Sequence, residues 1–358
     1  MKILINALSG NGDALMFSPS LRILKEKFPE SRIDMLVMFK SVREMYSENP
    51  FINNIYFIDF LRQSKIKSLK EIRDLKNNNY DYSINVYPAN RAEYNIVNAF
   101  LGAEKKIAHH YLHTNLLRAE YFNDILVDEV KDRHNVLQNL NLVKTLTEAK
   151  DEEAGKLEIF ISGNERENAE EWIAKINPDK KMLIGFHPGS AVIKNQINKR
   201  WDKSKFAALG DLLIQKYNAA ILLFGNEFEL NEEIKSMMNG NAVIASTQNY
   251  MDSMARMTYC RLFVSNDTAF MHSAAALQIP VAAVFAYTNQ KELYPWKTKH
   301  VLVRKELECS PCFYNSPKPA DCKWKEEDKF KCIKMINVSE VDDAVNKLII
   351  NSENPTQL

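Results

Sequence analysis

The stretch "LINALSGNGDALMFSPSLRILKEKFP" at residues 4–29 begins as an apolar run, passes through a loop with two glycines and resumes as an amphipathic helix. This order predicts a strand, a turn and a helix. Backbone N–H groups and the helix dipole at such a junction usually bind an anion. Asp13 stands at this point and would repel a phosphate. The sequence therefore predicts that Asp13 is either a helix cap or a chemical group facing a neutral substrate.

Length and composition indicate a globular chain of two domains, because it has 358 residues of which 46% are hydrophobic. The formal net charge is +1, and neither half carries the basic excess of a nucleic-acid binder. We therefore expect no nucleic-acid partner. Neither a leader nor a long apolar run is found in the sequence, so we expect a cytoplasmic soluble protein that is still able to touch a membrane surface.

The first half alternates between strand-like and helical segments. Strands are predicted at 2–8, 32–38, 54–59 and 81–87, with helices at about 14–28, 41–48, 65–79 and 91–101. This βαβ series predicts a parallel sheet. The polar stretch at 147–156 interrupts the series and is predicted to be a linker.

The alternation restarts in the second half. Strands are predicted at 181–190, 219–225, 242–246, 261–267 and 280–286, with helices at 203–217, 227–238, 250–258 and from about 268 to 277. We therefore predict an α/β protein of two Rossmann-like domains whose parallel sheets face a central cleft. Ligands of such sheets bind outside the carboxyl ends of the strands.

One predicted strand end carries the sequence "SNDTAFMH" at 265–272. Asp267 is placed to cap the next helix, and Thr268 and Ala269 supply N–H groups in its first turn, which would suit a diphosphate. The alternative is a plain helix cap followed by a histidine, His272, whose hydrogen bonds are satisfied within the protein.

Two other loops carry charged candidates. Lys199 lies in "NKRWDKSKF" at 198–206, where a lysine above a sheet can neutralise a phosphate, although most loop lysines are simply solvated. Glu227 follows the strand that ends in "FGNE", where a carboxylate can accept the two hydroxyls of a ribose. Its alternative is an ordinary acid in the first turn of a helix.

Several nucleotide motifs are missing from the sequence. It contains no GxxxxGK[ST], and "GNGDAL" lacks the third glycine of a dinucleotide fingerprint. It also contains no D-x-D to hold a divalent cation on a diphosphate. We therefore expect no catalytic metal or other cofactor, with lysine and helix N-termini balancing the charge of the leaving group.

Together, the segments at 2–29, "HPGS…KRW", "FGNE" and "SNDTAFMHSAAALQIPVAAVF" resemble the heptosyltransferase family, glycosyltransferase family nine. The resemblance extends over nearly the whole chain. It implies a GT-B enzyme that moves a sugar from a nucleotide donor, typically ADP-heptose, to an acceptor hydroxyl with inversion.

The resemblance also implies roles for individual residues. Asp13 matches the general base, and Ser9, Asn11 and Gly12 belong to the same acceptor-side loop. The residues implied in donor binding are Ser190, Lys199 beside the phosphates, Glu227 on the adenosine ribose, and Asp267, Thr268, Ala269 and His272 of the signature motif. Many relatives have glycine where this chain has Ala269, which would shift the phosphate slightly.

The predicted domains are an acceptor domain at 1–150, a nucleotide-sugar domain at 151–336, and a C-terminal helix and tail at 337–358 that crosses back to the first domain. The acceptor is open between a lipopolysaccharide core, another glycolipid or glycan, and a protein. Another nucleotide sugar and a non-catalytic sugar-nucleotide binding protein are further alternatives. A glycolipid acceptor would bring the enzyme to the inner face of the cell membrane.

Four of the five cysteines lie within the segment 309–332. Cys309, Cys312, Cys322 and Cys332 have a spacing that suits a structural zinc or iron site. Reduced thiols and disulfides are the alternatives.

Overall fold

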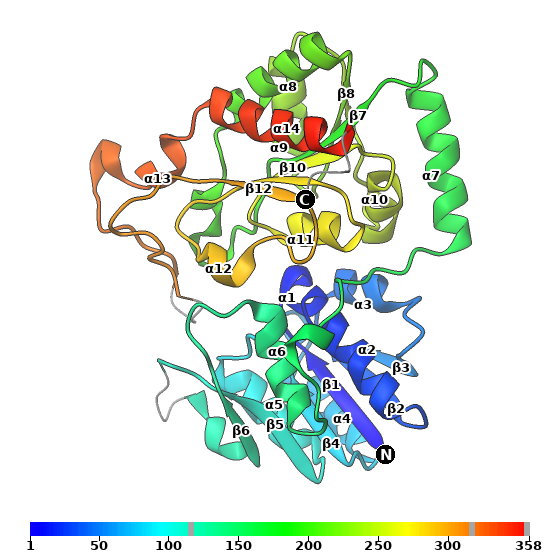
Figure 1. The fold of residues 1–358 in the computed structure, drawn as a ribbon. Coiled ribbons are helices and arrows are strands. Elements are labelled where there is room, and N and C mark those ends of the chain that lie inside the picture. Colours follow the sequence, from blue (N-terminus) through cyan, green and yellow to red (C-terminus); the bar gives the residue numbers. More distant parts are fainter. Residues whose placement is uncertain (114–117, 315–318, 354–358) are drawn as a thin grey trace. The chain divides into compact units, whose positions relative to one another are not determined.

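The computed structural model describes residues 1–113, 118–314 and 319–353. They divide into two compact units, of which the first runs from Met1 to Phe160 and the second begins at Ile161 (Figure 1).

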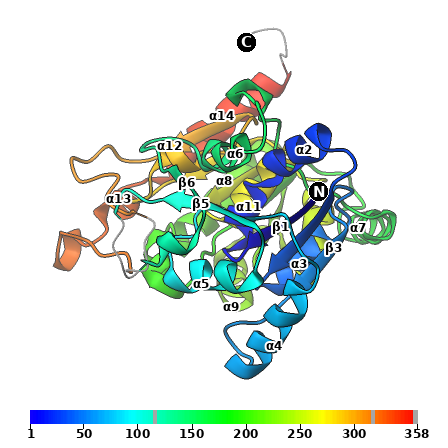
Figure 2. The same cartoon turned by 90° about the horizontal axis from the view of Figure 1, so that it is seen from below.

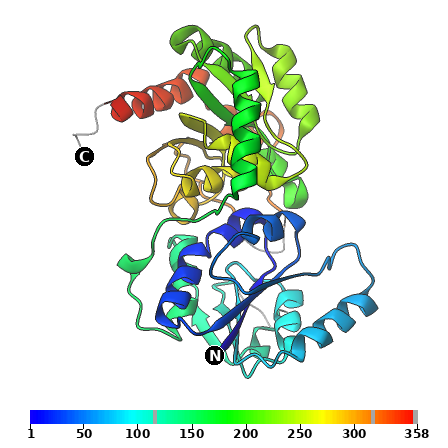
Figure 3. The same cartoon turned by 90° about the vertical axis from the view of Figure 1, so that its right-hand side faces the viewer.

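The first unit is built on a six-stranded parallel sheet of order β3-β2-β1-β4-β5-β6. Its strands are β1 (Lys2–Ala7), β2 (Arg32–Val37), β3 (Asn54–Phe57), β4 (Tyr82–Asn85), β5 (Lys105–His110) and β6 (Ile125–Asp128). Its helices are α1 (Asn11–Leu15), α2 (Ser18–Lys27), α3 (Lys40–Tyr46), α4 (Lys65–Lys76), α5 (Ala92–Leu101), the 3₁₀ turns η2 (Glu120–Phe122) and η3 (Asp151–Glu153), and α6 (Asn135–Lys144). Figure 3 shows α2 on one side of the strands and α4 and α5 on the other.

The second unit repeats this topology with the order β12-β11-β10-β7-β8-β9. Its strands are β7 (Leu183–His187), β8 (Ala220–Leu223), β9 (Ala242–Ile244), β10 (Leu262–Asn266), β11 (Val281–Val284) and β12 (His300–Val303). Its helices are α7 (Gly163–Ile176), η4 (Ile193–Lys199), α8 (Lys203–Tyr217), α9 (Phe228–Met237), α10 (Tyr250–Met257), α11 (Ala269–Ala276), α12 (Gln290–Leu293), η5 (Glu326–Asp328), α13 (Lys331–Lys334) and α14 (Val338–Glu353).

Both sheets have a topological switch point, where the connections leave in opposite directions. It lies between β1 and β4 in the first unit and between β7 and β10 in the second. The two parallel sheets confirm the predicted α/β class with two Rossmann-like folds. The carboxyl ends of these central strands are where a ligand is expected.

Some elements differ from the prediction. The helix expected at 14–28 is two helices, α1 and α2, and Pro19 lies in the first turn of α2, where a residue without an N–H is tolerated. Strands β5, β6 and β12 and helices α6 and α7 were not predicted. Within the described residues, no helix is both long and apolar enough to cross a bilayer.

Helix α14 completes the core of the second unit. Its residues Val341, Val345, Leu348 and Ile349 are buried, and the helix lies against α8, β10, β11 and β12. We expected this apolar face to be buried on the first domain. It is buried in the second unit instead, because the face of the sheet beside α8 provides the apolar surface that it needs.

The switch point of the first sheet is held by buried amides. Asn6 of β1 is in register with Asn85 of β4, and its side chain donates to Asn85 Oδ1 at 3.1 Å. Asn6 also donates to Asn98 Oδ1 of α5 at 2.8 Å, and Asn98 donates to Asn123 at 2.7 Å. These neutral hydrogen bonds fix β1, β4 and α5 together without any charge.

Candidate functional site

The loops at the switch point of the second sheet are tied together by Asn266, the last residue of β10. Its side-chain NH₂ donates to the carbonyl oxygens of Pro188 at 2.8 Å and Gly189 at 3.2 Å, and its oxygen accepts from the Trp201 N–H at 3.0 Å. The loop after β7 and the loop before α8 are therefore fixed to the end of β10.

An ion pair lies beside this junction. Lys199 Nζ is 3.3 Å from Asp267 Oδ2, and the two side chains are only 13% and 4% exposed. Charges this deeply buried are costly unless they are paired. The pair therefore places one cation and one anion beside the carboxyl end of β10.

Glu227, at the N-cap of α9 after β8, is a second carboxylate of the cluster, and its side chain is 26% exposed. Its Oε1 lies 3.3 Å from Arg200 Nη2, and its Oε2 lies 3.8 Å from His187 Nε2. Burial alone would raise the pKa of Glu227, but the hydrogen bond and charge of His187 and the charge of Arg200 outweigh it and hold the pKa below its ordinary value. The carboxylate is therefore ionised at neutral pH.

Two glycines make room for this carboxylate. A Cβ atom added to Gly189 would lie 2.4 Å from the carboxylate atoms of Glu227, which is closer than any van der Waals contact. Gly225 has a φ of +113°, a backbone conformation that favours glycine. Glycine at these positions therefore lets the Glu227 carboxylate lie between the loops after β7 and β8.

Helix α11 begins next to this cluster with Thr268 at its N-cap, so our expectation that Asp267 caps the helix is wrong. Asp267 pairs with Lys199 instead. The Thr268 hydroxyl makes no cap hydrogen bond either, because it is bonded to His187 Nδ1 at 2.9 Å. The His187 ring in turn stacks on Phe270, with ring centroids 4.4 Å apart. The first turn of α11 thus has no side-chain cap, which is the arrangement that an anion site requires.

The other predicted donor residues lie around these. Ser190 is buried, and its hydroxyl donates to the Gln196 carbonyl at 2.9 Å and accepts from Arg200 Nε at 3.1 Å. Ala269 is the first residue of α11. His272 is buried, its Nδ1 has no hydrogen-bond partner within the described ranges, and burial lowers its pKa to about 4.

In the first unit, Asp13 lies in the first turn of the short helix α1, just after β1. Gly10 occupies the N-cap position, so the interpretation of Asp13 as the helix cap is wrong. Asn11 Oδ1 accepts from the Ser41 hydroxyl at 2.7 Å, and the Tyr46 hydroxyl donates to the Ala14 carbonyl at 2.7 Å. Both hydrogen bonds attach α1 to α3.

The remaining loop residues, Ser9 and Gly12, flank this attachment, and Ser9 is buried. Tyr94 of α5 lies within electrostatic range of Asp13. Burial raises the pKa of Tyr94, Arg91 lowers it, and the negative charge of Asp13 raises it further. The carboxyl edge of the first sheet therefore carries a carboxylate, a phenol and a guanidinium.

Sequence reasoning missed the roles of His187, Arg200, Asn266, Gly189 and Tyr94. The first four lie in motifs that were singled out, directly after a strand or before α8. Position alone was therefore a usable signal for them. Tyr94 had no such signal, because it lies inside α5.

The four clustered cysteines are reduced in this structure. Burial raises the pKa of Cys312, and the neighbouring thiols Cys309 and Cys322 raise it further. Burial, then the thiol of Cys312 and to a smaller extent those of Cys322 and Cys309, raise the pKa of Cys332 to about 11. In the described part of the chain, no group of three or more His, Cys, Asp or Glu side chains is close enough to hold a metal ion as it stands.

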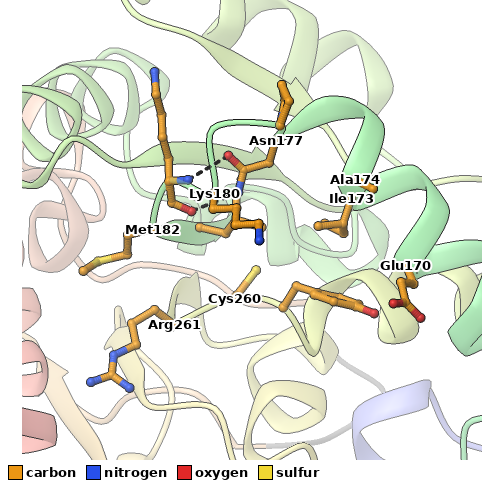
Figure 4. A pocket seen from close by; sticks show the side chains of 12 residues that line it. Glu170, Ile173, Ala174, Asn177, Lys180, Met182, Cys260 and Arg261 are labelled. Atoms are coloured by element: carbon orange, nitrogen blue, oxygen red, sulfur yellow. Dashed lines mark hydrogen bonds between the residues drawn. The ribbon is translucent and has the colours of Figure 1, made fainter.

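A pocket of about 850 Å³ lies elsewhere in the second unit, between α7 and the amino ends of β7 and β10 (Figure 4). Lys181, Tyr259 and Arg261 are among the residues that line it. None of the predicted site residues does. It lies at the end of the sheet opposite to the charged cluster and is therefore not the candidate site.

Known proteins resemble this chain in both sequence and structure. The family model of glycosyltransferase family 9 (heptosyltransferase) matches residues 68–321. A lipooligosaccharide heptosyltransferase 2 of Campylobacter jejuni is 25% identical, over 98% of this chain and 99% of that protein. The structure of E. coli ADP-heptose lps heptosyltransferase II superimposes with a TM-score of 0.76 at 19% identity, over 99% of this chain and 100% of that one. An iron-containing dodecameric glycosyltransferase, TibC of enterotoxigenic E. coli, matches with a TM-score of 0.59 at 12% identity, over 99% of this chain and 77% of that one.

Proposed function

Because this chain belongs to glycosyltransferase family 9 (heptosyltransferase), we propose that it transfers a heptose from ADP-heptose to a hydroxyl of a lipopolysaccharide core. The names of the matched proteins support this donor and this acceptor. The observation that carries the proposal is the charged cluster at the switch point of the second sheet, where Lys199, Asp267, Arg200 and Glu227 meet the uncapped start of α11.

The donor binds to this cluster in the proposed complex. The Lys199 ammonium and the first-turn N–H groups of α11 hold the diphosphate, and the Glu227 carboxylate accepts from the two hydroxyls of the adenosine ribose. The unpartnered His272 Nδ1 supports the presence of a ligand on this side of α11.

Asp13 acts as the general base. Its carboxylate takes the proton of the acceptor hydroxyl while that oxygen forms a bond to the anomeric carbon of the heptose. The bond between the anomeric carbon and the phosphate oxygen breaks, and ADP leaves with the electron pair. The charge on the departing diphosphate is stabilised by Lys199 and the α11 dipole, so the reaction needs no divalent cation.

We also propose that Cys309, Cys312, Cys322 and Cys332 bind a structural zinc or iron ion. Four thiols in one segment support this, because the pKa values of Cys312 and Cys332 are raised by burial and in part by the neighbouring thiols. The iron named for the TibC structure supports it as well. The thiols would have to approach one another more closely than they do in this structure. Metal analysis of the purified protein tests the proposal, and a metal content near zero contradicts it.

The enzyme works at the inner face of the cell membrane in this proposal, because its acceptor is a glycolipid. The test is an assay with purified protein, ADP-heptose and heptose-deficient lipopolysaccharide. We expect ADP release together with a heptosylated product, both unchanged by EDTA.

Thermal shifts with ADP-, GDP-, UDP- and CMP-sugars test the donor independently. Stabilisation by a UDP- or GDP-sugar but not by ADP-heptose would contradict the proposed donor. Binding of ADP-heptose without transfer to any acceptor would make the chain a binding protein.

A further inference from the structure

Helices α4 and α5 lie side by side in the first unit (Figure 2), and η2 contacts α5. We call the exposed side of these three elements the α4–α5–η2 surface. Its exposed apolar residues are Ile66, Leu69, Ile96, Phe100, Tyr121 and Phe122, and the exposed Leu61 lies just before α4. Scattered apolar residues are normal on a protein surface, but a group on adjacent elements marks an interaction site.

Helix α4 has both buried and exposed apolar residues. Ile72 and Leu75, in its second half, are buried and belong to the apolar core of the first unit. Ile66 and Leu69, in its first half, are 82% and 52% exposed and are not part of that core. The first half of α4 therefore presents large apolar side chains to solvent.

The same surface extends along α5. Ile96 and Phe100 are four residues apart and lie on one exposed face, and Phe100 is 56% exposed. In η2, the rings of Tyr121 and Phe122 lie beside each other with centroids 4.7 Å apart. Aromatic side chains of this kind are typical of the boundary between water and lipid.

The apolar residues of α4 are surrounded by cations. Residues 61–76 contain six Lys or Arg and two Asp or Glu, a net charge of +4, whereas the whole chain has a net charge of +1. Lys67 lies 3.8 Å from Glu71 in an exposed and therefore weak pair. Within residues 1–113, 118–314 and 319–353, no ion pair is found for Lys65, Lys70 or Arg73.

We propose that the α4–α5–η2 surface binds an anionic lipid bilayer. The apolar side chains of α4 enter the boundary between headgroups and acyl chains, and the lysines at its sides contact the lipid phosphates. The inference rests on the proposed function, because a glycolipid acceptor is what gives the enzyme a reason to bind a membrane. The surface itself is argued from exposure and charge alone.

A second copy of this chain is a poorer fit to the surface. A symmetric dimer would place the same patch against itself, and residues 61–76 of each copy would bring a charge of +4 to the contact. An anionic bilayer instead presents the opposite charge together with an apolar interior.

Sedimentation with vesicles tests the proposal. The full chain is mixed with vesicles of phosphatidylcholine alone, or of equal parts phosphatidylcholine and phosphatidylglycerol. We expect binding to the anionic vesicles only, weakening as salt is added. The triple variant Lys65→Gln, Lys67→Gln, Lys70→Gln should bind on the order of 100-fold more weakly, at roughly fivefold per cation.

The double variant Ile66→Ser, Leu69→Ser should bind at least roughly tenfold more weakly. A matched control, Lys175→Gln, Lys235→Gln, Lys325→Gln, removes the same charge from exposed positions of the second unit and should bind as the wild type does. Affinity for ADP, measured in parallel, should be unchanged in all three variants.

Three results would overturn the inference. These are no binding to anionic vesicles, equal losses in the triple variant and its control, or a dimer in light scattering that Ile66→Ser, Leu69→Ser dissociates. Vesicle binding by a protein that does not transfer heptose would leave the inference standing and contradict the proposed function alone.

Discussion

The two switch points share one topology and differ in chemistry. In the second unit, the strand ends carry the pairs Lys199–Asp267 and Arg200–Glu227. In the first unit, the equivalent strands are joined by the uncharged amides of Asn6 and Asn85. Charged side chains that are already fixed in position suit a charged ligand. The neutral amides of the first unit, in contrast, form no ion pairs that would compete with its one proposed catalytic carboxylate, Asp13.

This difference indicates a division of labour between the units. In our proposal, the second unit binds the anionic nucleotide, and the first supplies Asp13 for proton transfer. Changes in the first unit should therefore alter the chemical step, and changes in the second should alter nucleotide affinity. Variants in each unit test this separation.

The largest effect is expected from Asp13→Asn, which removes the proposed base. Turnover should fall by roughly 100- to 10,000-fold while affinity for ADP stays the same, since general-base assistance is commonly worth this much. Steady-state kinetics and calorimetric titration with ADP measure the two quantities.

The control for this variant is Glu48→Gln, an exposed acid of the same unit. It should leave both quantities unchanged. An Asp13→Asn protein that keeps most of its turnover would remove Asp13 from the mechanism.

Acid should destabilise both units through one buried histidine in each. Burial lowers the pKa of His109 to about 3 and that of His272 to about 4, so between pH 6.5 and these values the unfolded chain binds a proton that the folded chain does not. Stability is therefore lost as the pH falls through this window. The losses should be ~5 kcal/mol for His109 and ~3 kcal/mol for His272, from 1.36 kcal/mol per pKa unit.

Urea unfolding of His109→Gln and His272→Gln between pH 7 and pH 3 measures these losses. Each variant should show a flatter pH dependence than the wild type in its own unit. A wild-type-like slope in both variants would mean that neither histidine is buried in its neutral form.

Lys199→Met should weaken ADP binding by roughly 10- to 100-fold, because a hydrogen bond to a charged group contributes ~1.5–3 kcal/mol. Lys203→Met is the matched control, since Lys203 lies nearby at the start of α8 and is 44% exposed in its pair with Glu233. Titration with ADP compares them. Equal losses would show that the effect is one of general charge rather than of the site.

The smallest effect is expected from Gly189→Ala. The added methyl group would meet the carboxylate of Glu227, which is the free end of a flexible side chain, so the protein should fold while Glu227 moves away. Affinity for ADP should fall by roughly three- to tenfold, within the range of one lost hydrogen bond.

Gly163→Ala provides the control, because a Cβ there meets no atom within 4 Å. Thermal melting should give similar midpoints for both variants. Unchanged ADP affinity in Gly189→Ala would argue against a ribose contact by Glu227.

The sequence predicted the buried central strands well, because their apolar runs are long. It did not predict β5, whose sequence "KKIAHH" mixes polar and apolar residues, or β12, an edge strand of which only Val303 is buried. Helix α7 was missed because only Ala169 is buried on it, although Ser162 and Glu165 form a capping box that could have marked its start.

The candidate site, like the fold, could be predicted only in part from the sequence. Asp267, Lys199 and Glu227 were found because charged residues after strands stand out in a sequence. The hydrogen bond between His187 and Thr268 joins residues 81 positions apart, and the space that Gly189 leaves for Glu227 is a contact between two loops. Such contacts exist only once the sheet has formed, so no local pattern could reveal them.

Helix α14 also sets an order of events during synthesis. The apolar core of the second unit includes the buried residues of α14, a helix of 16 residues. Just before this helix, the carbonyl of Ile336 accepts a hydrogen bond from the Trp201 indole N–H. On the ribosome, the first unit can fold as soon as residue 160 has emerged, whereas the second must wait until α14 has emerged as well. A ribosome that stops short of α14 therefore leaves a folded first unit joined to an open second one, which is a substrate for chaperones and proteases.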